Sequence, residues 1–558
     1  MNICMAQIDS RIGDLAGNLE RILAAHRRAE RLQADLVVYP ELVLSGYPPR
    51  DLLFEPDFLP AVERTLELLT AATSEGPPLV VGTPLRCEQG LYNGAVLLHQ
   101  GRQIGMQAKR LLPGQDVFHE NRWFIPGQQA EVLSLPGLPP FELRICEDLW
   151  GDLPSTDSRL VIALNASPYR REIFPRRLQA ARRTGKSVYY CNAVGAQDEL
   201  IFDGGSFALD QSGNLVGALP RFEEEVDFPV SPFQELSPSE ELRRALVLGI
   251  RGFFAKNGVR QAVLGLSGGI DSALVACLAV EALGPDRVRA LALPSRHTDP
   301  RSTESATELA AQLGIELEVV PLEPIYEPAR HLLGVTGTAA ENLQARLRMV
   351  ALMARVNQGS GLLLNTSNKT ELTLGYGTLY GDLCGTLGPL NDLTKPQVYQ
   401  LARLYPEIPE FILSRPPSAE LSEGQVDPFD YPSLAPQLEE LVQKQTWSPE
   451  LARSEHKRRQ GPIGLKVSEK AFGTGRFVPV TARMIYPPED FCYHKGRTGA
   501  ALERSRDGQP GAPSLHSAGG RSTDEPANAS ERPDRPGLRG GYSQQRSGSR
   551  GGLSGIAL

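Results

Sequence analysis

A loop that could hold phosphate ends one of the apolar runs of this 558-residue chain. The stretch LGLSGGIDSALVA spans residues 264–276, and its pattern becomes helical just after Gly268 and Gly269. Glycine lets an anion approach backbone amides, and a helix N-terminus adds unpaired amides and the positive end of its dipole. A Walker loop would continue with GKS or GKT, whereas this chain continues with Asp271 and Ser272. The pattern therefore fits either a tight turn or a cradle for phosphate oxygens.

Charged side chains suited to nucleotide chemistry follow in NTSNKTELTLGYGTLYGDLCG, which begins where the apolar residues 361–364 end. They are Lys369, Glu371 and Asp382, and the later motif LTKPQ adds Lys395. Transfer of phosphoryl or nucleotidyl groups needs cations against phosphate charge and carboxylate oxygens for Mg²⁺. This set meets both needs.

Two further polar groups have weaker signals. Asn342 and Arg346 are four residues apart on an expected helix and share one of its faces, which also fits an ordinary exposed hydrogen-bonding pair. The motif EHKRRQ at 455–460 contains Lys457 and could bind phosphate, but a solvated run of charges is the simpler interpretation.

A second chemistry is indicated by Cys146, Glu41 and Lys109, each of which stands at the end of an expected strand. A free thiol has a pKa of about 8.5, so it needs a base to attack as thiolate at neutral pH. Amide hydrolysis also needs a cation or hydrogen-bond donors for the oxyanion. No histidine has a comparable position, which argues against a Cys-His pair. Taken singly, each residue also fits a structural role, as a buried cysteine or a solvated charge.

The elements that must position these residues differ between the two halves of the chain. Up to about residue 220, short β-rich runs alternate with helical stretches, and residues 94–109 form an expected hairpin that turns near Gly101. This predicts an α/β sandwich with both parallel and antiparallel strand pairs. Other expected elements are strands at 2–8, 34–40, 78–85 and 141–150 and a helix at 18–33.

The second half alternates more regularly between strand and helix. Helices are expected at 271–284, 302–314 and 339–358, the first two closed by Gly284 and Gly314, and strands at 260–266, 287–293, 315–320 and 361–367. Repeated strand-helix-strand units predict a doubly wound parallel sheet with helices on both faces. Ligands bind such sheets at the carboxyl ends of the strands, where Gly268 and Gly269 lie.

Composition bounds the class of protein. With 41% hydrophobic residues over this length, two or more domains are expected. A formal charge of −8 gives no general reason to expect a nucleic-acid partner. Seven cysteines without CxxC spacing fit neither a zinc site nor a disulfide framework, which favours a reducing, cytoplasmic compartment. No run approaches the roughly 18 apolar residues of a membrane span, so a soluble protein without a membrane partner is expected.

Changes in composition predict the domain boundaries. Prolines and acidic residues become more frequent near 221–240. We therefore expect a first domain at 1–225, a linker at 226–240 and a second domain at 241–490. Residues 491–558 are rich in Gly, Ser, Arg and Pro and cannot bury enough apolar surface to offset the entropy of ordering, so a disordered tail is expected. Its RGG-like pieces could contact RNA, and a misread C-terminus would give the same composition.

Six motifs of the second half, in this order, resemble the synthetase domain of glutamine-dependent NAD⁺ synthetases. They are SGGIDS, ENLQAR, NKTELTLGYGTLYGD, LTK, PPSAEL and EHKRRQ. The resemblance implies an ATP-pyrophosphatase domain that adenylylates the nicotinate carboxylate of deamido-NAD⁺ and lets ammonia displace AMP. It implies ATP contacts at Ser267, Gly268, Gly269, Ile270, Asp271, Ser272 and Thr366. It also implies Mg²⁺ at Asp271 and Glu371, and dinucleotide contacts at Asn342, Arg346, Glu371, Asp382, Lys395 and Lys457.

Three motifs of the first half resemble the Glu-Lys-Cys amidases of the nitrilase superfamily. They are VVYPELVLSGYPPRDLL, KRLLPGQDVFHENRWFIPG and RICEDLW, and VYYCNAVGAQDELIFDGGSFALD is closer still to the bifunctional synthetases. The resemblance implies an αββα sandwich that hydrolyses glutamine, with Glu41 as general base, Lys109 stabilising the tetrahedral intermediate, Cys146 acylated and Glu120 supporting the lysine. It places glutamine recognition at Gln115, Glu147, Trp150 and Ser167.

Two positions depart from the family pattern. Ser367 stands where the family usually has glycine, and could crowd the backbone near the nucleotide without abolishing function. Gln115 stands where an aromatic residue is common, which could alter how glutamine is held.

The resemblance covers about residues 1–490 and implies a homo-oligomer, at least dimeric through the synthetase half, with an internal route for ammonia. Other glutamine-fed, ATP-consuming amidotransferases are the first alternative, but GMP synthetases pair a similar loop with a Cys-His-Glu glutaminase, and asparagine synthetases use an N-terminal cysteine. A non-catalytic nucleotide-binding regulator is the second alternative. The complete set of Glu41, Lys109, Cys146, Asp271 and Glu371 argues against it.

Overall fold

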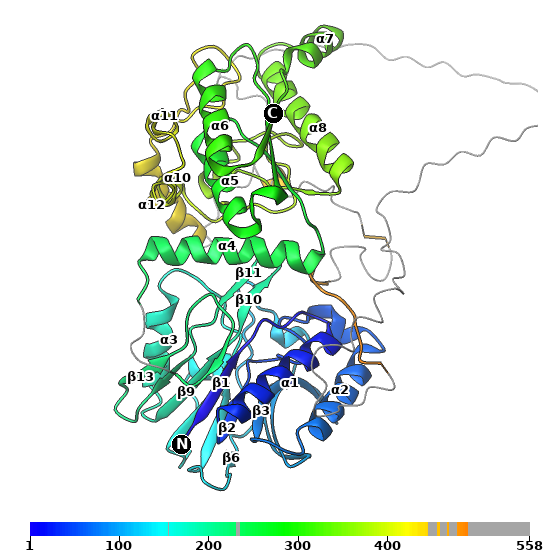
Figure 1. Cartoon of the computed structure of the whole chain (residues 1–558), viewed down its shortest axis with the longest axis vertical. Coiled ribbons are helices and arrows are strands. Elements are labelled where there is room, and N and C mark those ends of the chain that lie inside the picture. The colour runs from blue at the N-terminus through cyan, green and yellow to red at the C-terminus, as the bar shows by residue number, and fades with distance from the viewer. Residues whose placement is uncertain (155, 230–234, 445–454, 458–465, 468–476, 489–558) are drawn as a thin grey trace, which may run out of the picture. The chain divides into compact units, whose positions relative to one another are not determined.

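The computed structural model describes residues 1–154, 156–229, 235–444, 455–457, 466–467 and 477–488 (Figure 1). All of these residues belong to one compact unit of the chain, Met1–Glu489. The expected tail at 491–558 lies outside the described residues. Within the described residues, no helix is long and apolar enough to cross a membrane.

The N-terminal half is a sandwich of two six-stranded sheets. The first has the order β14-β1-β2-β3-β4-β5 and the second β13-β12-β9-β8-β7-β6. The first comprises β1 (Ile3–Gln7), β2 (Leu36–Val38), β3 (Leu79–Cys87), β4 (Gly90–His99), β5 (Arg102–Ala108) and β14 (Glu225–Asp227). The second comprises β6 (Val132–Leu133), β7 (Phe141–Ile145), β8 (Leu160–Asn165), β9 (Ser187–Asn192), β12 (Phe207–Leu209) and β13 (Leu215–Ala218).

Helices cover the outer faces of both sheets, so the layers follow the αββα order that the sequence predicts. α1 (Leu15–Arg31) and α2 (Phe58–Ala72) pack on the first sheet, and α3 (Ile173–Arg182) packs on the second. All six residues of β8 are buried, as expected for a continuous apolar strand that is covered on both faces. The predicted mixture of strand pairs is confirmed, because β1, β2 and β3 pair in parallel whereas β3, β4 and β5 form antiparallel hairpins.

The C-terminal half contains a parallel four-stranded sheet in the order β17-β16-β15-β18. Its strands are β15 (Ala262–Gly265), β16 (Val288–Ala292), β17 (Glu316–Val319) and β18 (Leu362–Leu363). α5 (Ile270–Leu283) and α6 (Pro300–Leu313) share a core with one face of the sheet, and α8 (Thr338–Gly359) packs on the other. The predicted doubly wound sheet is therefore confirmed. Its remaining helices are α7 (Glu323–Leu333), α9 (Lys369–Leu374), α10 (Lys395–Ala402), α11 (Glu410–Ser414) and α12 (Tyr431–Gln443).

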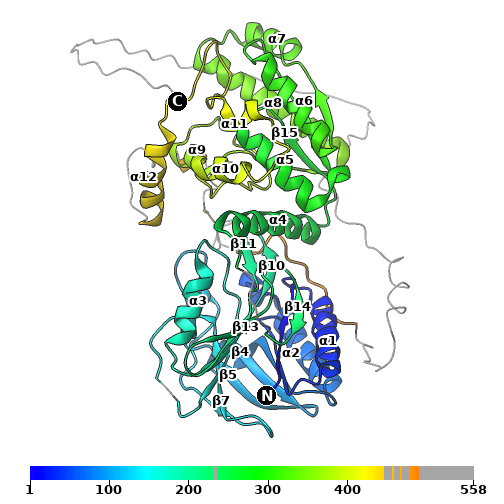
Figure 2. The same cartoon turned by 60° about the vertical axis from the view of Figure 1, so that its left-hand side comes forward.

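The long helix α4 (Pro238–Asn257) packs against elements of both halves. It contacts α5 on one side and the hairpin of β10 (Val194–Gln197) and β11 (Leu200–Asp203) on the other, as Figures 1 and 2 show. A Cβ at Gly252 would lie 2.9 Å from the Cβ of Ala196, so glycine permits this close approach. The expected boundary at 225 falls inside β14, and α4 begins within the expected linker.

Candidate active sites

Three candidate catalytic residues of the N-terminal half follow the ends of strands in the facing sheets. Glu41 follows β2, Lys109 follows β5 and Cys146 follows β7, where it opens the 3-10 turn η3 (Cys146–Leu149). Cys146 has a backbone φ of +44°, a left-handed conformation that is uncommon for a residue with a side chain. Unusual backbone conformations of this kind cluster at functional sites.

The ammonium group of Lys109 lies between two buried carboxylates. Its Nζ is 2.7 Å from Glu41 Oε1 and 2.8 Å from Glu120, and all three side chains are buried. Although burial alone would lower it, the carboxylates of Glu120 and Glu41 raise the pKa of Lys109 well above its ordinary value. Lys109 therefore stays cationic at neutral pH, as the stabilisation of an oxyanion requires.

The thiol of Cys146 is buried beside these charges. Burial, followed by the Glu41 carboxylate, raises the pKa of Cys146 well above its ordinary value, and Lys109 opposes the rise. The thiol is thus protonated at neutral pH and needs a base before it can attack a carbonyl carbon. Glu41 exerts the largest effect among the charged neighbours, which suits it to that task.

Two polar residues of this site, Asn93 and Tyr47, are not among the site residues predicted from the sequence, although Tyr47 lies inside the motif VVYPELVLSGYPPRDLL. The amide of Asn93 donates to Glu41 Oε1 at 2.7 Å, and the hydroxyl of Tyr47 donates to Glu120 Oε1 at 2.8 Å. The backbone amide of Ala166 donates to the other oxygen of Glu41 at 3.0 Å. Asn93 was detectable in principle, because it is a buried polar residue inside the mostly apolar strand β4.

The side chain of Asp148 ties the lysine and cysteine segments together. Its Oδ1 accepts from the amides of Arg110 at 3.0 Å and Leu111 at 2.9 Å, and its Oδ2 accepts from the amide of Ile145 at 3.1 Å. The residue just after Lys109 and the residue just before Cys146 are therefore held by one buried carboxylate.

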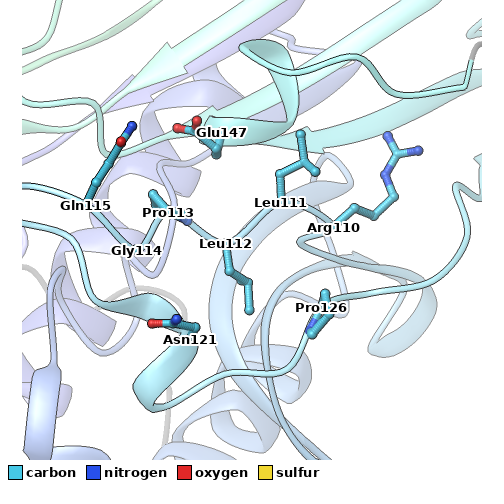
Figure 3. Close-up of a pocket in the computed structure, with 9 residues that line it drawn as sticks. All are labelled: Arg110, Leu111, Leu112, Pro113, Gly114, Gln115, Asn121, Pro126 and Glu147. Carbon is cyan, nitrogen blue, oxygen red and sulfur yellow. The ribbon is translucent and has the colours of Figure 1, made fainter.

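A cavity of about 570 Å³ is lined by Arg110 and Glu147, the residues that follow Lys109 and Cys146, whereas Lys109 and Cys146 themselves do not line it. Figure 3 shows Gln115 and Glu147 in one part of the cavity wall and Arg110 in another. Burial raises the pKa of Glu147 above its ordinary value. Trp150 and Ser167, the other two residues expected to recognise glutamine, are not among the residues that line this cavity. The hydroxyl of Ser167 instead accepts from Arg177 Nε at 3.2 Å.

In the C-terminal half, the SGGIDS loop (residues 267–272) joins β15 to α5 at the carboxyl end of the sheet. Gly268 has a φ of +76°, and a Cβ there would lie 2.2 Å from the carbonyl oxygen of Ser302. Backbone contact with α6 therefore requires glycine at 268 whether or not phosphate binds. Gly269 caps α5, and a Cβ there would meet only Ser267 Oγ, at 3.2 Å.

A cluster of charges stands directly beside the SGGIDS loop. Lys395 Nζ lies 2.5 Å from Asp271 Oδ2 and 3.4 Å from Glu371 Oε1, and Asn368 donates to Asp271 Oδ1 at 2.9 Å. Burial and the nearby Asp271 carboxylate raise the pKa of Glu371 to about 8. Within the ranges that the structure describes, no group of three or more potential metal-ligating side chains occurs. Mg²⁺ often takes only one or two protein carboxylates, so Asp271 and Glu371 suit it.

The raised pKa of Glu371 predicts a pH-dependent effect of Glu371→Gln on stability. The native pKa of about 8 exceeds the ordinary value of 4.5, so protonation of Glu371 favours the folded state. That contribution is complete below pH 4.5 and is lost as the pH rises through about 8. Glutamine cannot ionise, so the stability of the variant relative to the wild type should rise between these pH values, by up to about 5 kcal/mol at about 1.4 kcal/mol for each pH unit. Thermal unfolding without nucleotide or Mg²⁺ measures this difference, and parallel curves at all pH values would contradict it.

Four residues expected to contact the dinucleotide converge on the turn at 375–382. Asn342 Oδ1 accepts from Thr378 Oγ1 at 2.7 Å, and Arg346 Nε donates to the Leu379 carbonyl at 3.2 Å. Lys457 Nζ donates to the carbonyls at 375 and 377, at 3.0 and 3.1 Å, and Asp382 Oδ1 accepts from the Thr378 amide at 2.8 Å. Of the EHKRRQ motif, only 455–457 lie within the described residues.

Two further expectations concern the neighbouring motif TSNK, residues 366–369. Lys369 pairs with Asp392 at 2.9 Å and with Glu439 at 3.0 Å, rather than with the carboxylates beside the SGGIDS loop. Ser367 does not have a positive φ, so the position of the family's glycine does not demand one here. Its hydroxyl faces the Asp382 carbonyl at 3.4 Å, and the preceding Thr366 is partly buried.

Comparisons with known proteins find a family model for each half of the chain and relatives that match both halves together. The carbon-nitrogen hydrolase family model matches residues 2–229, and the NAD synthase family model matches residues 242–461. The glutamine-dependent NAD(+) synthetase of Xylella fastidiosa (strain Temecula1) is 39% identical over 538 residues, which cover 86% of this chain and 98% of that protein. The enzyme of the same name from Synechocystis is 37% identical, with coverage of 87% and 99%.

Solved structures give the same result. The glutamine-dependent NAD⁺ synthetase of Acinetobacter baumannii, determined in complex with ADP, has a TM-score of 0.75 and 30% identity, and the match covers 87% of this chain and 99% of that one. The synthetase from Cytophaga hutchinsonii shares the fold, with a TM-score of 0.69 at 20% identity and coverage of 83% and 89%. This chain belongs to the family of glutamine-dependent NAD⁺ synthetases.

Proposed function

We propose that this chain converts deamido-NAD⁺, ATP, glutamine and water into NAD⁺, AMP, pyrophosphate and glutamate. The observation that carries the proposal is the presence of two separate sets of reactive groups in one chain. The buried set around Lys109 suits amide hydrolysis, and the set around Asp271 and Lys395 suits chemistry on a nucleotide. Amide hydrolysis alone would not explain the charges beside the SGGIDS loop, and nucleotide chemistry alone would not explain the buried groups around Lys109.

In the glutaminase half, we assign the base to Glu41 and the nucleophile to Cys146. Glu41 removes the thiol proton, and the thiolate attacks the side-chain carbonyl of glutamine. Lys109, kept cationic by Glu41 and Glu120, stabilises the tetrahedral oxyanion. Glu41 then returns the proton to the leaving nitrogen, so ammonia departs and a Cys146 thioester remains. Water hydrolyses the thioester to glutamate, with Glu41 again as base.

Glutamine itself we assign to the cavity beside Cys146. Glu147 and Gln115 line it, and the carboxylate of Glu147 offers a counter-charge for the ammonium group of the amino acid. Trp150 and Ser167 stay in the proposed recognition set, although neither lines the cavity in this structure. The Ser167 hydroxyl, which is held by Arg177, would need to turn toward the ligand or act through Arg177.

In the synthetase half, the loop residues Ser267, Gly269 and Ser272 would hold the phosphates of ATP at the N-terminus of α5. Asp271 and Glu371 would hold Mg²⁺, which supplies positive charge against the phosphate oxygens. Lys395, between the same carboxylates, would add a second cation near the pyrophosphate as it leaves. The groups around the turn at 375–382 would orient the dinucleotide acid so that its carboxylate meets the α-phosphate.

Ammonia made at Cys146 must reach the acyl adenylate before water protonates it. An enclosed route between the two sites is therefore part of the proposal. We also propose the cytoplasm as the location, because a nucleophilic thiol needs a reducing compartment and six cysteines of the described residues are free. The domain assignment 1–225, 226–240 and 241–490 is proposed with the correction that β14 extends the first domain to Asp227.

We further propose a homo-oligomer formed through the synthetase half. Apolar side chains stand exposed on the contacting helices α7 and α8, with exposed fractions of 87% at Leu332, 61% at Leu333, 62% at Val350 and 36% at Met353. Exposed apolar side chains on neighbouring helices favour association when a partner covers them. We expect Val350→Asp to shift the particle mass toward the monomer in light scattering. A wild-type protein that is monomeric at micromolar concentration would contradict the proposal.

The overall reaction is tested by product stoichiometry. Purified protein is incubated with deamido-NAD⁺, ATP, Mg²⁺ and glutamine, and NAD⁺, AMP, pyrophosphate and glutamate are measured together. We expect NAD⁺, AMP and pyrophosphate in equal amounts, with at least as much glutamate. Formation of ADP and phosphate in place of AMP and pyrophosphate would contradict the proposed adenylylation.

A further inference from the structure

The C-terminal segment of the described chain, residues 477–488, returns to the N-terminal half (orange in Figure 1). It is anchored there at three separate places. The Asp51 amide donates to the Phe477 carbonyl, and the Phe477 amide donates to the Asp51 carboxylate. The amides of Val480 and Thr481 donate to the carboxylate of Asp198. The amides of Arg483 and Ile485 donate to the carbonyls of Ile12 and Gly13. Phe477 and Asp51 are 426 positions apart in the sequence, and Val480 and Asp198 are 282 positions apart.

The fit at these anchors is close. The hydroxyl of Thr481 also donates to Asp198, at 2.8 Å, and Thr481 is completely buried. A Cβ at Gly13, which has a φ of +78°, would lie 2.1 Å from the carbonyl oxygen of Arg483. A glycine is therefore required in the N-terminal half for the segment to lie where it does.

Asp51 is the anchor that leads toward the proposed glutaminase site. It lies in the 3-10 turn η1 (Arg50–Phe54) and is buried. Its carboxylate accepts from Arg122 Nε at 2.9 Å, Arg122 Nη2 at 3.0 Å, Trp123 Nε1 at 2.7 Å and the Phe477 amide at 2.7 Å. One carboxylate thus joins the C-terminal segment to Arg122 and Trp123. A bidentate pair of this kind fixes orientation as well as position.

Arg122, which donates to Asp51, belongs to the turn that carries Glu120, and Trp123 directly follows that turn. The 3-10 turn η2 spans Glu120–Arg122, so Glu120, which meets Lys109, and Arg122, which meets Asp51, lie on one turn. The guanidinium of Arg122 is also held between aromatic rings, 5.1 Å from the ring centre of Phe477 and 5.6 Å from that of Phe54. Phe477 therefore holds Arg122 through its ring and Asp51 through its amide.

We infer that Asp51 and the segment 477–488 position the glutaminase site by fixing η2, and with it Glu120, against Lys109. The inference rests on the proposed function. Asp51 contacts neither Cys146 nor Lys109 in any hydrogen bond described above, so it is a positioning residue rather than a catalytic one. The last described segment of the synthetase half would thereby set the rate of the reaction in the other half.

The inference predicts a loss confined to the glutamine reaction. A displacement of a supporting group by about 1 Å can cost up to about 100-fold in rate. We expect Asp51→Ala to lower kcat with glutamine by about 30- to 100-fold and Phe477→Ala to lower it by about 10-fold, with the KM for glutamine changed less than about threefold. NAD⁺ formation from ammonium salts should stay within about twofold of the wild type, since no residue of the synthetase site is altered.

Asp198→Ala tests the role of the segment away from η2. It removes the acceptor for Val480 and Thr481, and we expect a smaller loss of about threefold to tenfold in kcat with glutamine. The matched control is Asp210→Ala. Asp210 likewise caps a turn of the N-terminal half, by accepting from the Asn214 amide at 2.8 Å, but it does not contact the segment. Its glutamine turnover should equal that of the wild type.

The measurement is full-length protein assayed with glutamine and, separately, with ammonium chloride, together with glutamine hydrolysis without ATP. Asp51→Asn, which keeps oxygen and loses charge, should recover part of the rate lost in Asp51→Ala. Equal losses with both nitrogen sources, or a normal glutamine rate in Asp51→Ala and Phe477→Ala, would overturn the inference. A wild-type protein that makes NAD⁺ from neither source would instead overturn the proposed function, so the two failures are distinguishable.

Discussion

Cys146→Ala is expected to abolish NAD⁺ formation from glutamine and to leave formation from ammonium salts within about twofold of the wild type. The thiol is the only proposed nucleophile of the glutaminase half, so without it no thioester forms and the loss should be on the order of 10³-fold or more. The residues around Asp271 and Lys395 are untouched, and ammonia supplied from solution can still attack the acyl adenylate. Parallel assays with glutamine and with ammonium chloride measure both effects.

The control for this substitution is Cys191→Ala. Cys191 is a completely buried cysteine of β9 in the core between the two sheets, so its replacement removes the same atom from the same half. We expect a loss of about 1–2 kcal/mol in stability and unchanged use of glutamine. If Cys146→Ala lost both activities, or if Cys191→Ala lost glutamine use alone, the assignment of the nucleophile to Cys146 would be wrong.

Gly268→Ala is expected to lower NAD⁺ formation by at least about 100-fold with either nitrogen source. The new Cβ would lie 2.2 Å from the carbonyl oxygen of Ser302, a backbone atom that cannot move without displacing α6. The SGGIDS loop must therefore shift, and with it the amides proposed to hold the phosphates of ATP. Steady-state rates with saturating ATP and calorimetric binding of ATP measure the two consequences.

Gly284→Ala is the matched control, because Gly284 ends the same helix that Gly268 precedes. Its φ of +87° and ψ of 152° lie in a region that residues other than glycine rarely adopt, so alanine has a backbone cost here too, but no atom lies within 4 Å of the position of its Cβ. We expect a loss of about 1–3 kcal/mol in stability with normal activity. Gly268→Ala with normal ATP binding would show that the loop has only a structural role.

Local patterns in the sequence predict most of the elements. The expected strand at 2–8, the hairpin around Gly101 and the helix that ends at Gly314 depend on neighbours in the chain, and all are found as β1, β4 with β5, and α6. Proximity of Glu41 to Lys109 followed from their strand ends together with the family resemblance, because β2 and β5 run in the same direction and end at the same edge of one sheet.

Contacts between distant segments could not be predicted in the same way. Tyr47 reaches Glu120, Asn368 reaches Asp271 and Phe477 reaches Asp51 only because tertiary packing brings them together. Lys369 illustrates the converse, since its motif indicated phosphate binding whereas its ammonium group meets Asp392 and Glu439. For Gly268, the sequence fitted both a tight turn and a phosphate-binding loop. The contact with Ser302 is enough to explain the glycine by packing.

The transfer of nitrogen from glutamine to the dinucleotide is tested most directly by isotope tracing. Protein is incubated with deamido-NAD⁺, ATP, Mg²⁺ and glutamine labelled with ¹⁵N at its side-chain amide, in the presence of unlabelled ammonium chloride at equal concentration. Mass spectrometry of the product should find ¹⁵N in the carboxamide of most NAD⁺ molecules, and Cys146→Ala should incorporate none. NAD⁺ that carries only unlabelled nitrogen in the wild type, or no NAD⁺ at all, would contradict the account.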